Sequence, residues 1–269
     1  MWRGQPFGLG ARRPRVTRSY YPASLLEKYQ THSYSSYQSV KPPIQWAEHT
    51  PGSTTLWQTT FSNPVKAGDI VFAIFLVDER AYGSGLVSIV DTMQSNWTLI
   101  YNCGVGEQQT GASQYQLMVW RSSPLSASGT ETVKTNTVTA SLCDDPLIII
   151  EVPPPSTGVV NGSPSQWCKG QWTANPITAS ASVSKPSLAL TAIMFAQYQQ
   201  TGTFTPVPVS KVTNMFNLLI GVCYGSGGYS YLRLDYALVP PNPSISYDLQ
   251  VSGANSYPIV GSYAAFFLY

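Results

Sequence analysis

Charged side chains are scarce in this sequence. Asp, Glu, Lys and Arg together make up 10% of its 269 residues, whereas about 25% is usual in soluble domains. A surface with few Lys and Glu side chains loses little side-chain entropy when another molecule covers it. The composition therefore favours permanent burial in an assembly, with a Ser- and Thr-rich extracellular β protein as the alternative.

Long apolar runs are also missing. No stretch approaches the ~18 consecutive apolar residues of a membrane-spanning helix, so we expect no membrane segment. Met1 is followed by sequence that contains Arg, Pro and Gly rather than by the apolar region of a secretion signal. These features fit a virion protein that is made in the cytoplasm and released by lysis. They also fit a protein that is exported by another route.

Patterns typical of active sites are rare as well. The two histidines, His32 and His49, have no nucleophile motif such as G-x-S-x-G beside them. The glycine-rich stretch 225–228 lacks the lysine and the following helix of a phosphate-binding loop. Carboxylates on separate strands could serve glycoside hydrolysis, but adjacent acids such as Asp78-Glu79 are more typical of solvated turns. We therefore expect no enzyme.

Metal-binding patterns are weak too. The loop acids Asp69, Asp91 and Asp144 could contribute to a calcium site, but no D-x-D-x-D-G loop accompanies them, so we expect no metal and no cofactor. No cysteine belongs to a C-x-x-C pair, which leaves open two disulfides in any of three pairings as well as four free thiols. The four cysteines are Cys103, Cys143, Cys168 and Cys223.

What the sequence does have is an uneven division of charge. Up to Lys41 there are seven basic residues and one acid, a net charge of +6. From Pro42 onward there are eight basic residues and twelve acids, a net charge of −4. Residues 1–45 are therefore interpreted as a basic, Tyr-rich arm that cannot bury enough apolar surface to fold alone. Residues 46–269 are interpreted as a mildly acidic body.

The arm is expected to dock on another molecule. Its arginines could neutralise phosphates, but they are few for packing a genome, and tyrosines with large apolar faces and polar tips are typical of protein interfaces. We therefore favour docking on other copies of the chain or on other virion proteins over nucleic acid, with the acidic body of a neighbouring copy as a candidate partner. The expected docking residues are Arg3, Arg12, Arg13, Arg15, Arg18, Tyr20, Tyr21, Tyr29, Tyr34 and Tyr37.

The body is expected to be all-β. Short stretches that are apolar, or that alternate between apolar and polar residues, are separated by turns rich in Pro, Gly, Asn and Asp. No window has the 3.6-residue period of a helix. The continuous apolar runs 70–77 and 188–195 predict central strands.

Two parts of the body, at about 46–155 and 165–269, look like a repeat. Neither half alone has enough expected strands to close a core, so we expect a single two-layered sandwich built from both halves. The alternative is two small sandwiches joined by a linker at 153–164. The expected correspondences are 70–77 with 188–195, 97–101 with 204–209, 115–124 with 231–240, 130–139 with 244–251, and 147–152 with 263–269.

Several turn and sheet-edge motifs carry a resemblance at the level of the fold. They are Val65-Lys66-Ala67-Gly68-Asp69 before an apolar strand, Val90-Asp91-Thr92 leading to Asn96-Trp97-Thr98, Ser128-Gly129-Thr130-Glu131-Thr132-Val133, and Glu151-Val152. With these motifs the body resembles jelly-roll-type sandwich modules of phage structural proteins and of secreted bacterial proteins. The resemblance implies a jelly-roll-like fold and extracellular or virion roles, and it transfers no catalytic residue. The basic arm is a departure from the secreted modules.

Taken together, these features favour a non-enzymatic structural protein of a virion, such as a capsid, decoration or tail component, that self-assembles through its arm. The alternative is a secreted adhesin or glycan-binding module. For that alternative, Trp167 and Trp172 are the candidate glycan contacts because they lie in a loop-like stretch. Trp97 and Trp120 lie in expected strands, where packing in a core is the better explanation.

Overall fold

The structure, a computed structural model, describes residues 41, 43–48, 58–78, 88–105, 115–135, 147–155, 159–161, 167–171, 177–198, 203–208, 216–225, 228–252 and 260–269. Every regular element in these ranges is a β-strand, and the paired strands run antiparallel. The expected all-β sandwich fold is therefore confirmed. Within the same ranges, no helix is long and apolar enough to cross a membrane.

The described residues of the first half of the body form eight strands. They are β1 (Gln45–Glu48), β2 (Gln58–Thr60), β3 (Ile70–Asp78), β4 (Ile89–Asp91), β5 (Trp97–Val105), β6 (Tyr115–Ser122), β7 (Thr132–Thr135) and β8 (Leu147–Val152).

The second half contains the remaining strands of the described chain. They are β9 (Val159–Asn161), β10 (Trp167–Gln171), β11 (Ile177–Ser180), β12 (Ser187–Tyr198), β13 (Thr203–Pro208), β14 (Phe216–Gly225), β15 (Gly228–Val239), β16 (Ser244–Ser252) and β17 (Val260–Leu268).

Each half follows the strand order of a jelly roll. In the first half, a five-stranded sheet has the order β1-β8-β3-β6-β5, and a three-stranded sheet has the order β2-β7-β4. Pairing of the first strand with the eighth and of the second with the seventh is the wrapped arrangement of the jelly roll. The second half repeats it with β10-β17-β12-β15-β14, where β9 also pairs with β17, and with β11-β16-β13. Each strand of the first half thus has a counterpart whose number is higher by nine, from β1 and β10 to β8 and β17.

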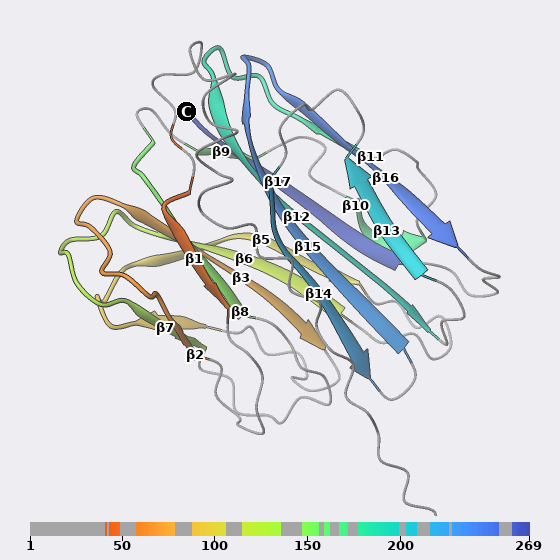
Figure 1. Cartoon of the computed structure of the whole chain (residues 1–269), viewed down its shortest axis with the longest axis horizontal. Coiled ribbons are helices and arrows are strands. Elements are labelled where there is room, and N and C mark those ends of the chain that lie inside the picture. Colours follow the sequence, from red (N-terminus) through yellow and green to blue (C-terminus); the bar gives the residue numbers. More distant parts are fainter. Residues whose placement is uncertain are drawn as a thin grey trace, which may run out of the picture.

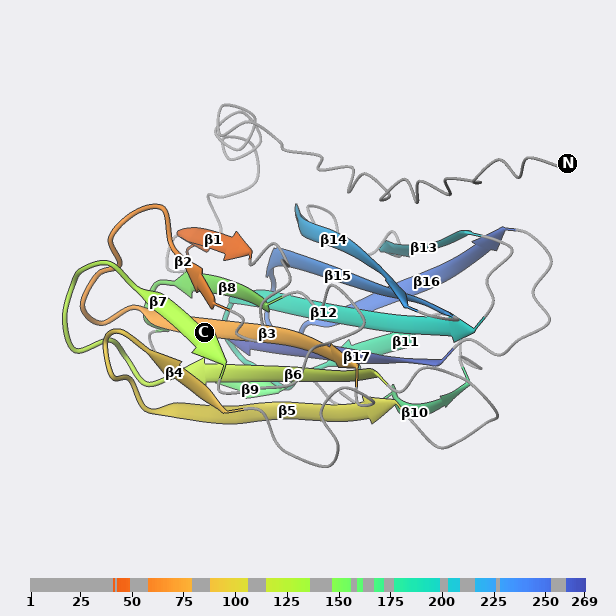
Figure 2. The same cartoon turned by 90° about the horizontal axis from the view of Figure 1, so that it is seen from below.

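The four sheets stack as four layers. Figure 1 shows them in succession across the view, and Figure 2 shows the same stack from below. The two large sheets are the inner layers and pack against each other through a middle core. On its other face, each large sheet packs against its own three-stranded sheet through a second core. Three apolar cores therefore separate four layers.

The central strands of the large sheets are apolar along much of their length because both faces are covered. In β3, Phe72 belongs to the middle core, whereas Val71 and Phe75 belong to the core of the first half. In β12, Leu190 belongs to the middle core and Ala189 to the core of the second half. The predicted central position of both strands is confirmed by their place in the sheets.

The middle core joins the two halves. The rings of Phe72 and Phe266 lie 6.1 Å apart, and the ring of Tyr101 meets Phe266 edge-on at 6.5 Å between centroids. The Tyr101 hydroxyl also donates a hydrogen bond to the backbone oxygen of Tyr263 in β17, at 3.2 Å. Apolar packing and a polar contact at its margin therefore hold the halves together.

The layering differs from the expected two layers. That expectation rested on each half having too few strands to enclose a core. In the first half, β2 and β4 are only three residues long, yet they complete a second sheet around β7. Construction from two similar halves holds, but each half encloses a core of its own in addition to the shared one.

Two details of the expected repeat are wrong. The run 97–101 lies in β5, whose counterpart is β14, whereas 204–209 begins in β13, the counterpart of β4. Strands β6 and β15 do correspond. The expected alignment of 115–124 with 231–240, however, pairs Tyr115 with Tyr231 and therefore places Val119 with Asp235. In the structure Val119 and Leu234 both point into the middle core. Side chains alternate along a strand, so a slip of one residue exchanges the two faces.

Candidate functional site

Most residues singled out from the sequence fall outside the described part of the chain. Trp167, which the sequence placed in a loop, lies in strand β10 at the edge of its sheet, opposite Tyr263 of β17. Trp172 lies outside the described residues. The cysteines are placed in β5 (Cys103), β10 (Cys168) and β14 (Cys223), with Cys143 outside the described residues. The arm residues outside them are Arg3, Arg12, Arg13, Arg15, Arg18, Tyr20, Tyr21, Tyr29, Tyr34 and Tyr37.

The described residues instead bring together polar side chains inside the body. One group lies in the core of the second half, and two pairs of carboxyl groups lie at one end of the first half. Sequence reasoning missed the group in the second half; of the two carboxyl pairs it singled out one member each, Asp69 and Asp91, as loop acids that could bind calcium, and it missed their partners Glu151 and Glu131. In the described ranges, no three His, Cys, Asp or Glu side chains come close enough together to hold a metal ion.

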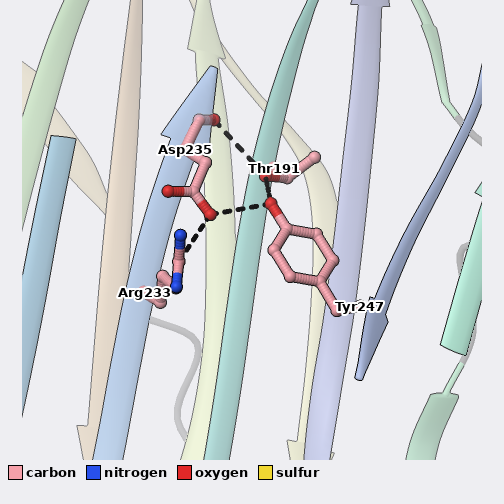
Figure 3. Close-up of polar contacts among 4 residues, drawn as sticks. All are labelled: Thr191, Arg233, Asp235 and Tyr247. Carbon is pink, nitrogen blue, oxygen red and sulfur yellow. Dashed lines mark hydrogen bonds and ion pairs between the residues drawn. The ribbon is translucent and has the colours of Figure 1, made fainter. Parts of the chain in front are cut away.

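The group in the second half, which we call the core network, consists of Thr191, Arg233, Asp235 and Tyr247 (Figure 3). Arg233 and Asp235 are two residues apart in β15 and therefore share a face of the sheet. Thr191 lies beside Asp235 in β12, and Tyr247 reaches in from β16 of the three-stranded sheet. The network thus links the two sheets of the second half.

The hydrogen bonds of the core network lead from donor to acceptor toward the Asp235 carboxylate. The Tyr247 hydroxyl donates to Asp235 Oδ2 at 2.7 Å, and Arg233 Nε donates to the same oxygen at 2.7 Å. Because the single Tyr247 proton is used in this way, Thr191 Oγ1 is the donor in its 2.6 Å contact with the Tyr247 oxygen. Asp235 is therefore a fully buried carboxylate that forms an ion pair with Arg233 and accepts a hydrogen bond from the Tyr247 hydroxyl.

The tyrosines around the core network stay protonated. Burial, together with the negative charge of Asp235, raises the pKa of Tyr247 and of Tyr263 well above the usual value. The Tyr263 hydroxyl donates to the backbone oxygen of Ile245 at 3.3 Å, and its ring packs edge-on against Tyr247 at 5.6 Å. Both phenols therefore act as fixed hydrogen-bond donors rather than as acids or nucleophiles.

The first half has an apolar core at the equivalent place. The strand registers align Arg233 and Asp235 of β15 with Met118 and Trp120 of β6, and Thr191 of β12 with Ala73 of β3. Met118 and Ala73 are completely buried in the core of the first half. The two jelly rolls therefore share a fold but fill the same position with different chemistry.

The first carboxyl pair consists of Asp69, in the turn before β3, and Glu151, near the end of β8. Glu151 Oε2 accepts a hydrogen bond from Gln45 Nε2 at 2.6 Å, and Glu151 Oε1 accepts one from the backbone N–H of Lys66 at 3.2 Å. Asp69 Oδ2 is buried and meets no hydrogen-bond donor within the part of the chain that the structure describes. Burial and the hydrogen-bonded Glu151 carboxyl raise the pKa of Asp69 to about 6, against a lowering influence of Lys66. Asp69 is therefore the member that holds a shared proton.

The second carboxyl pair, Asp91 and Glu131, has the same design. Asp91 Oδ1 accepts from the backbone N–H of Ser95 at 2.9 Å, and Asp91 Oδ2 accepts from Trp97 Nε1 at 2.8 Å. Glu131 Oε2 accepts from Thr92 Oγ1 at 3.2 Å, whereas Glu131 Oε1 is buried and has no hydrogen-bond partner in the described ranges. Burial and the neighbouring Asp91 carboxyl raise the pKa of Glu131 to about 7. In this pair Glu131 holds the proton.

Both carboxyl pairs lie at the same end of the first half. The loops that join β2 to β3, β4 to β5 and β6 to β7 gather there, at the left of Figure 2. They are tied together by backbone hydrogen bonds between Val65 and Gly129 and between Gly68 and Leu125. We call this region the loop end of the first half.

Comparisons with known proteins identify no family for the chain. No family model matches the sequence, and neither curated proteins nor solved structures give a match. The functional argument therefore depends on the sequence and on the arrangement described above.

Proposed function

We propose that the protein is a non-enzymatic structural component of a virion, such as a capsid, decoration or tail protein, which assembles with other copies through its N-terminal arm. The observation that carries the proposal is the duplicated jelly roll. Jelly rolls occur in viral capsids and in lectins, and here two of them share a middle core of buried apolar side chains. A four-layered block of this kind suits a building unit, because it presents fixed surfaces to its neighbours.

The polar groups of the body also support a structural role. Asp235 and Glu151 are almost completely buried, and their donors come from the protein itself. A catalytic carboxylate needs to reach a substrate. These carboxylates hold sheets and loops in place instead.

The structure changes how the arm is expected to dock. Of the acids in the body, Asp69, Glu131, Glu151 and Asp235 are buried, so they offer no surface charge to the arm of another copy. The formal charge of −4 therefore overstates how strongly the body attracts arginine side chains. Docking of the arm should depend more on its tyrosines than on its arginines.

Assembly of the purified chain tests this proposal. The full chain and a variant lacking residues 1–41 are compared by light scattering and electron microscopy, with circular dichroism as the measure of folding. We expect the truncated chain to keep its β spectrum and to lose assembly into particles. A truncated chain that assembles as completely as the full chain would overturn the proposal.

Two further variants separate the contributions within the arm. In one, the five arm tyrosines are changed to Ser; in the other, the five docking arginines are changed to Gln. Assembly should be lost in the tyrosine variant and only weakened in the arginine variant, because large aromatic faces contribute most to interfaces.

The rival function is glycan binding, which the jelly roll also supports elsewhere. One observation supports glycan binding, namely the position of Trp167 on the edge strand β10. A glycan array distinguishes the two functions: binding by the wild-type chain that is lost on changing Trp167 and Trp172 to Ala would favour a lectin.

A further inference from the structure

The loop end of the first half contains two buried carboxyl oxygens that meet no hydrogen-bond donor among the described residues. Asp69 Oδ2 and Glu131 Oε1 are both in this condition, and the two side chains are 5% and 0% exposed. A buried acceptor without a donor is costly, and a buried charge is more costly still. In each pair the partner carboxylate already accepts two hydrogen bonds from N–H groups. The missing donor is therefore a proton on Asp69 and on Glu131.

We propose that the loop end of the first half is a pH-sensitive latch, in which one proton in each of the pairs Asp69–Glu151 and Asp91–Glu131 holds the loops against the strand ends: the first pair at β8 of the large sheet, and the second at β4 and β7 of the three-stranded sheet. Loss of these protons leaves two like charges side by side in each pair and loosens the loops. The latch belongs to the folded chain itself, so it does not depend on the proposed function.

The surroundings of each pair offer little compensation for the added charge. Asp69 faces Glu151 of β8 and Lys66 of its own turn, and Lys66 is the one cation among the groups that influence it. Glu131 faces Asp91 of β4, and the influences that lower its pKa are hydrogen bonds from Thr92 and from the backbone of Met93 rather than a charge. Ionisation of the second carboxyl in either pair is therefore opposed mainly by repulsion and burial.

The latch also reaches β1, whose first residue is the last residue of the arm as bounded from the sequence. Gln45, the first residue of β1, donates to Glu151 Oε2 at 2.6 Å, and it exchanges two hydrogen bonds with the backbone of Asn63. The first carboxyl pair thus holds the strand into which the arm leads. Loosening this pair should weaken the hold on β1 together with the loops.

The second half provides an internal comparison. The strand registers and loop hydrogen bonds place Ser187 where the first half has Asp69, Phe267 where it has Glu151, and Pro243 where it has Glu131. None of these replacements can hold a titrating proton. The pH response should therefore be confined to the first half.

The sign of the response follows from the direction of the pKa shifts. A carboxyl group whose pKa is higher in the folded state binds its proton more tightly there. Its contribution to the stability of the fold is therefore fully present below the pKa that the group has in the unfolded chain. It is lost as the pH rises through the folded pKa. The window runs from 3.8 to about 6 for Asp69 and from 4.5 to about 7 for Glu131. Within it, the unfolding equilibrium constant should rise by up to about tenfold per pH unit for each pair.

Chemical unfolding of the full chain across this window tests the latch. The wild type is compared with the double variant Asp69→Asn, Glu131→Gln, whose amides donate permanently as the protonated acids do. The unfolding constant of the wild type, divided by that of the variant, should rise steeply from pH 4 to pH 7 and then level off. The control Asp248→Asn, which removes a half-buried acid of β16 that belongs to neither pair, should keep the wild-type profile.

Infrared spectroscopy gives a second measurement that needs no folded variant. The C=O band of a protonated carboxyl should persist in the wild type at pH 6, where ordinary Asp and Glu side chains are ionised. Absence of that band, or a double variant with the same pH profile as the wild type, would overturn the proposal.

Discussion

Replacing Asp235 with Leu should destabilise the protein far more than replacing Asp235 and Arg233 together. The single change removes the carboxylate that Arg233 Nε meets at 2.7 Å and that the Tyr247 hydroxyl meets at 2.7 Å. The Arg233 side chain is only 12% exposed, so its charge stays largely buried after the ion pair is lost. Breaking a buried ion pair in this way costs about 3–5 kcal/mol. For a chain of this size that corresponds to a fall in Tm on the order of 10 °C.

The double replacement, Arg233→Met with Asp235→Leu, removes both charges. The first half already has Met118 and Trp120 at the equivalent positions of β6, so the jelly roll accommodates apolar residues there. Exchange of a buried ion pair for apolar side chains of similar volume is often neutral or stabilising. The Tyr247 hydroxyl would lose its acceptor, but it can donate to Thr191 Oγ1 in the same 2.6 Å contact, and Thr191 Oγ1 can donate to the backbone oxygen of residue 235, which lies 3.4 Å away. The free energy of unfolding of the double variant should therefore lie within about 1–2 kcal/mol of that of the wild type.

A double-mutant cycle by urea unfolding at neutral pH measures the difference. The wild type, the two single variants and the double variant should give a coupling energy of at least about 2 kcal/mol. The control Tyr247→Phe, which removes the phenolic donor but keeps the ion pair, should cost about 1–3 kcal/mol. Additive effects of the two single changes, or a cost of less than about 1 kcal/mol for Asp235→Leu, would contradict the reasoning.

Two further predictions concern the interface between the halves and the loop end. Phe266→Ala should cost about 3–5 kcal/mol, because the Phe266 ring packs against Phe72 and Tyr101 of the other half; the exposed Trp46, changed to Ala, is the control that should leave the unfolding midpoint nearly unchanged. Gly68→Ala should cost about 1–2 kcal/mol, because Gly68 has a φ of +91° and an added Cβ would contact nothing within 4 Å. Thermal unfolding measures both, and a neutral Gly68→Ala variant would contradict the backbone explanation.

The strands that were best predicted from the sequence are those covered on both faces. The apolar runs containing Phe72 and Leu190 have no polar alternation, and that property reflects their position between two cores. The short strands were harder to interpret. In β4 only Ile89 is buried, whereas Val90 is exposed, so its three residues carry almost no pattern. The number of layers depended on these short strands, which explains why two layers were expected.

The buried acids had a weak signal in the sequence. Glu151 follows the apolar run Leu147–Ile150, and Asp235 stands between Leu234 and Tyr236. An acid inside a strand that is covered on both faces must be buried and must have a partner. The partners themselves could not be predicted, because Gln45 and Lys66 are 106 and 85 residues away from Glu151 in the sequence.

The distribution of ionisable groups decides what a change of pH can do to this fold. The buried residues of the middle core are apolar side chains and one tyrosine, so the contact between the halves should hold over the range in which Asp69 and Glu131 titrate. The core network of the second half contains an ion pair and no pair of carboxyl groups. The carboxyl pairs of the first half do respond to a change of pH, because Asp69 and Glu131 lose their protons as the pH rises. A rise from acidic to neutral pH should therefore loosen one end of one jelly roll while the rest of the stack stays intact. Such a local change can alter a surface without dismantling the unit that carries it.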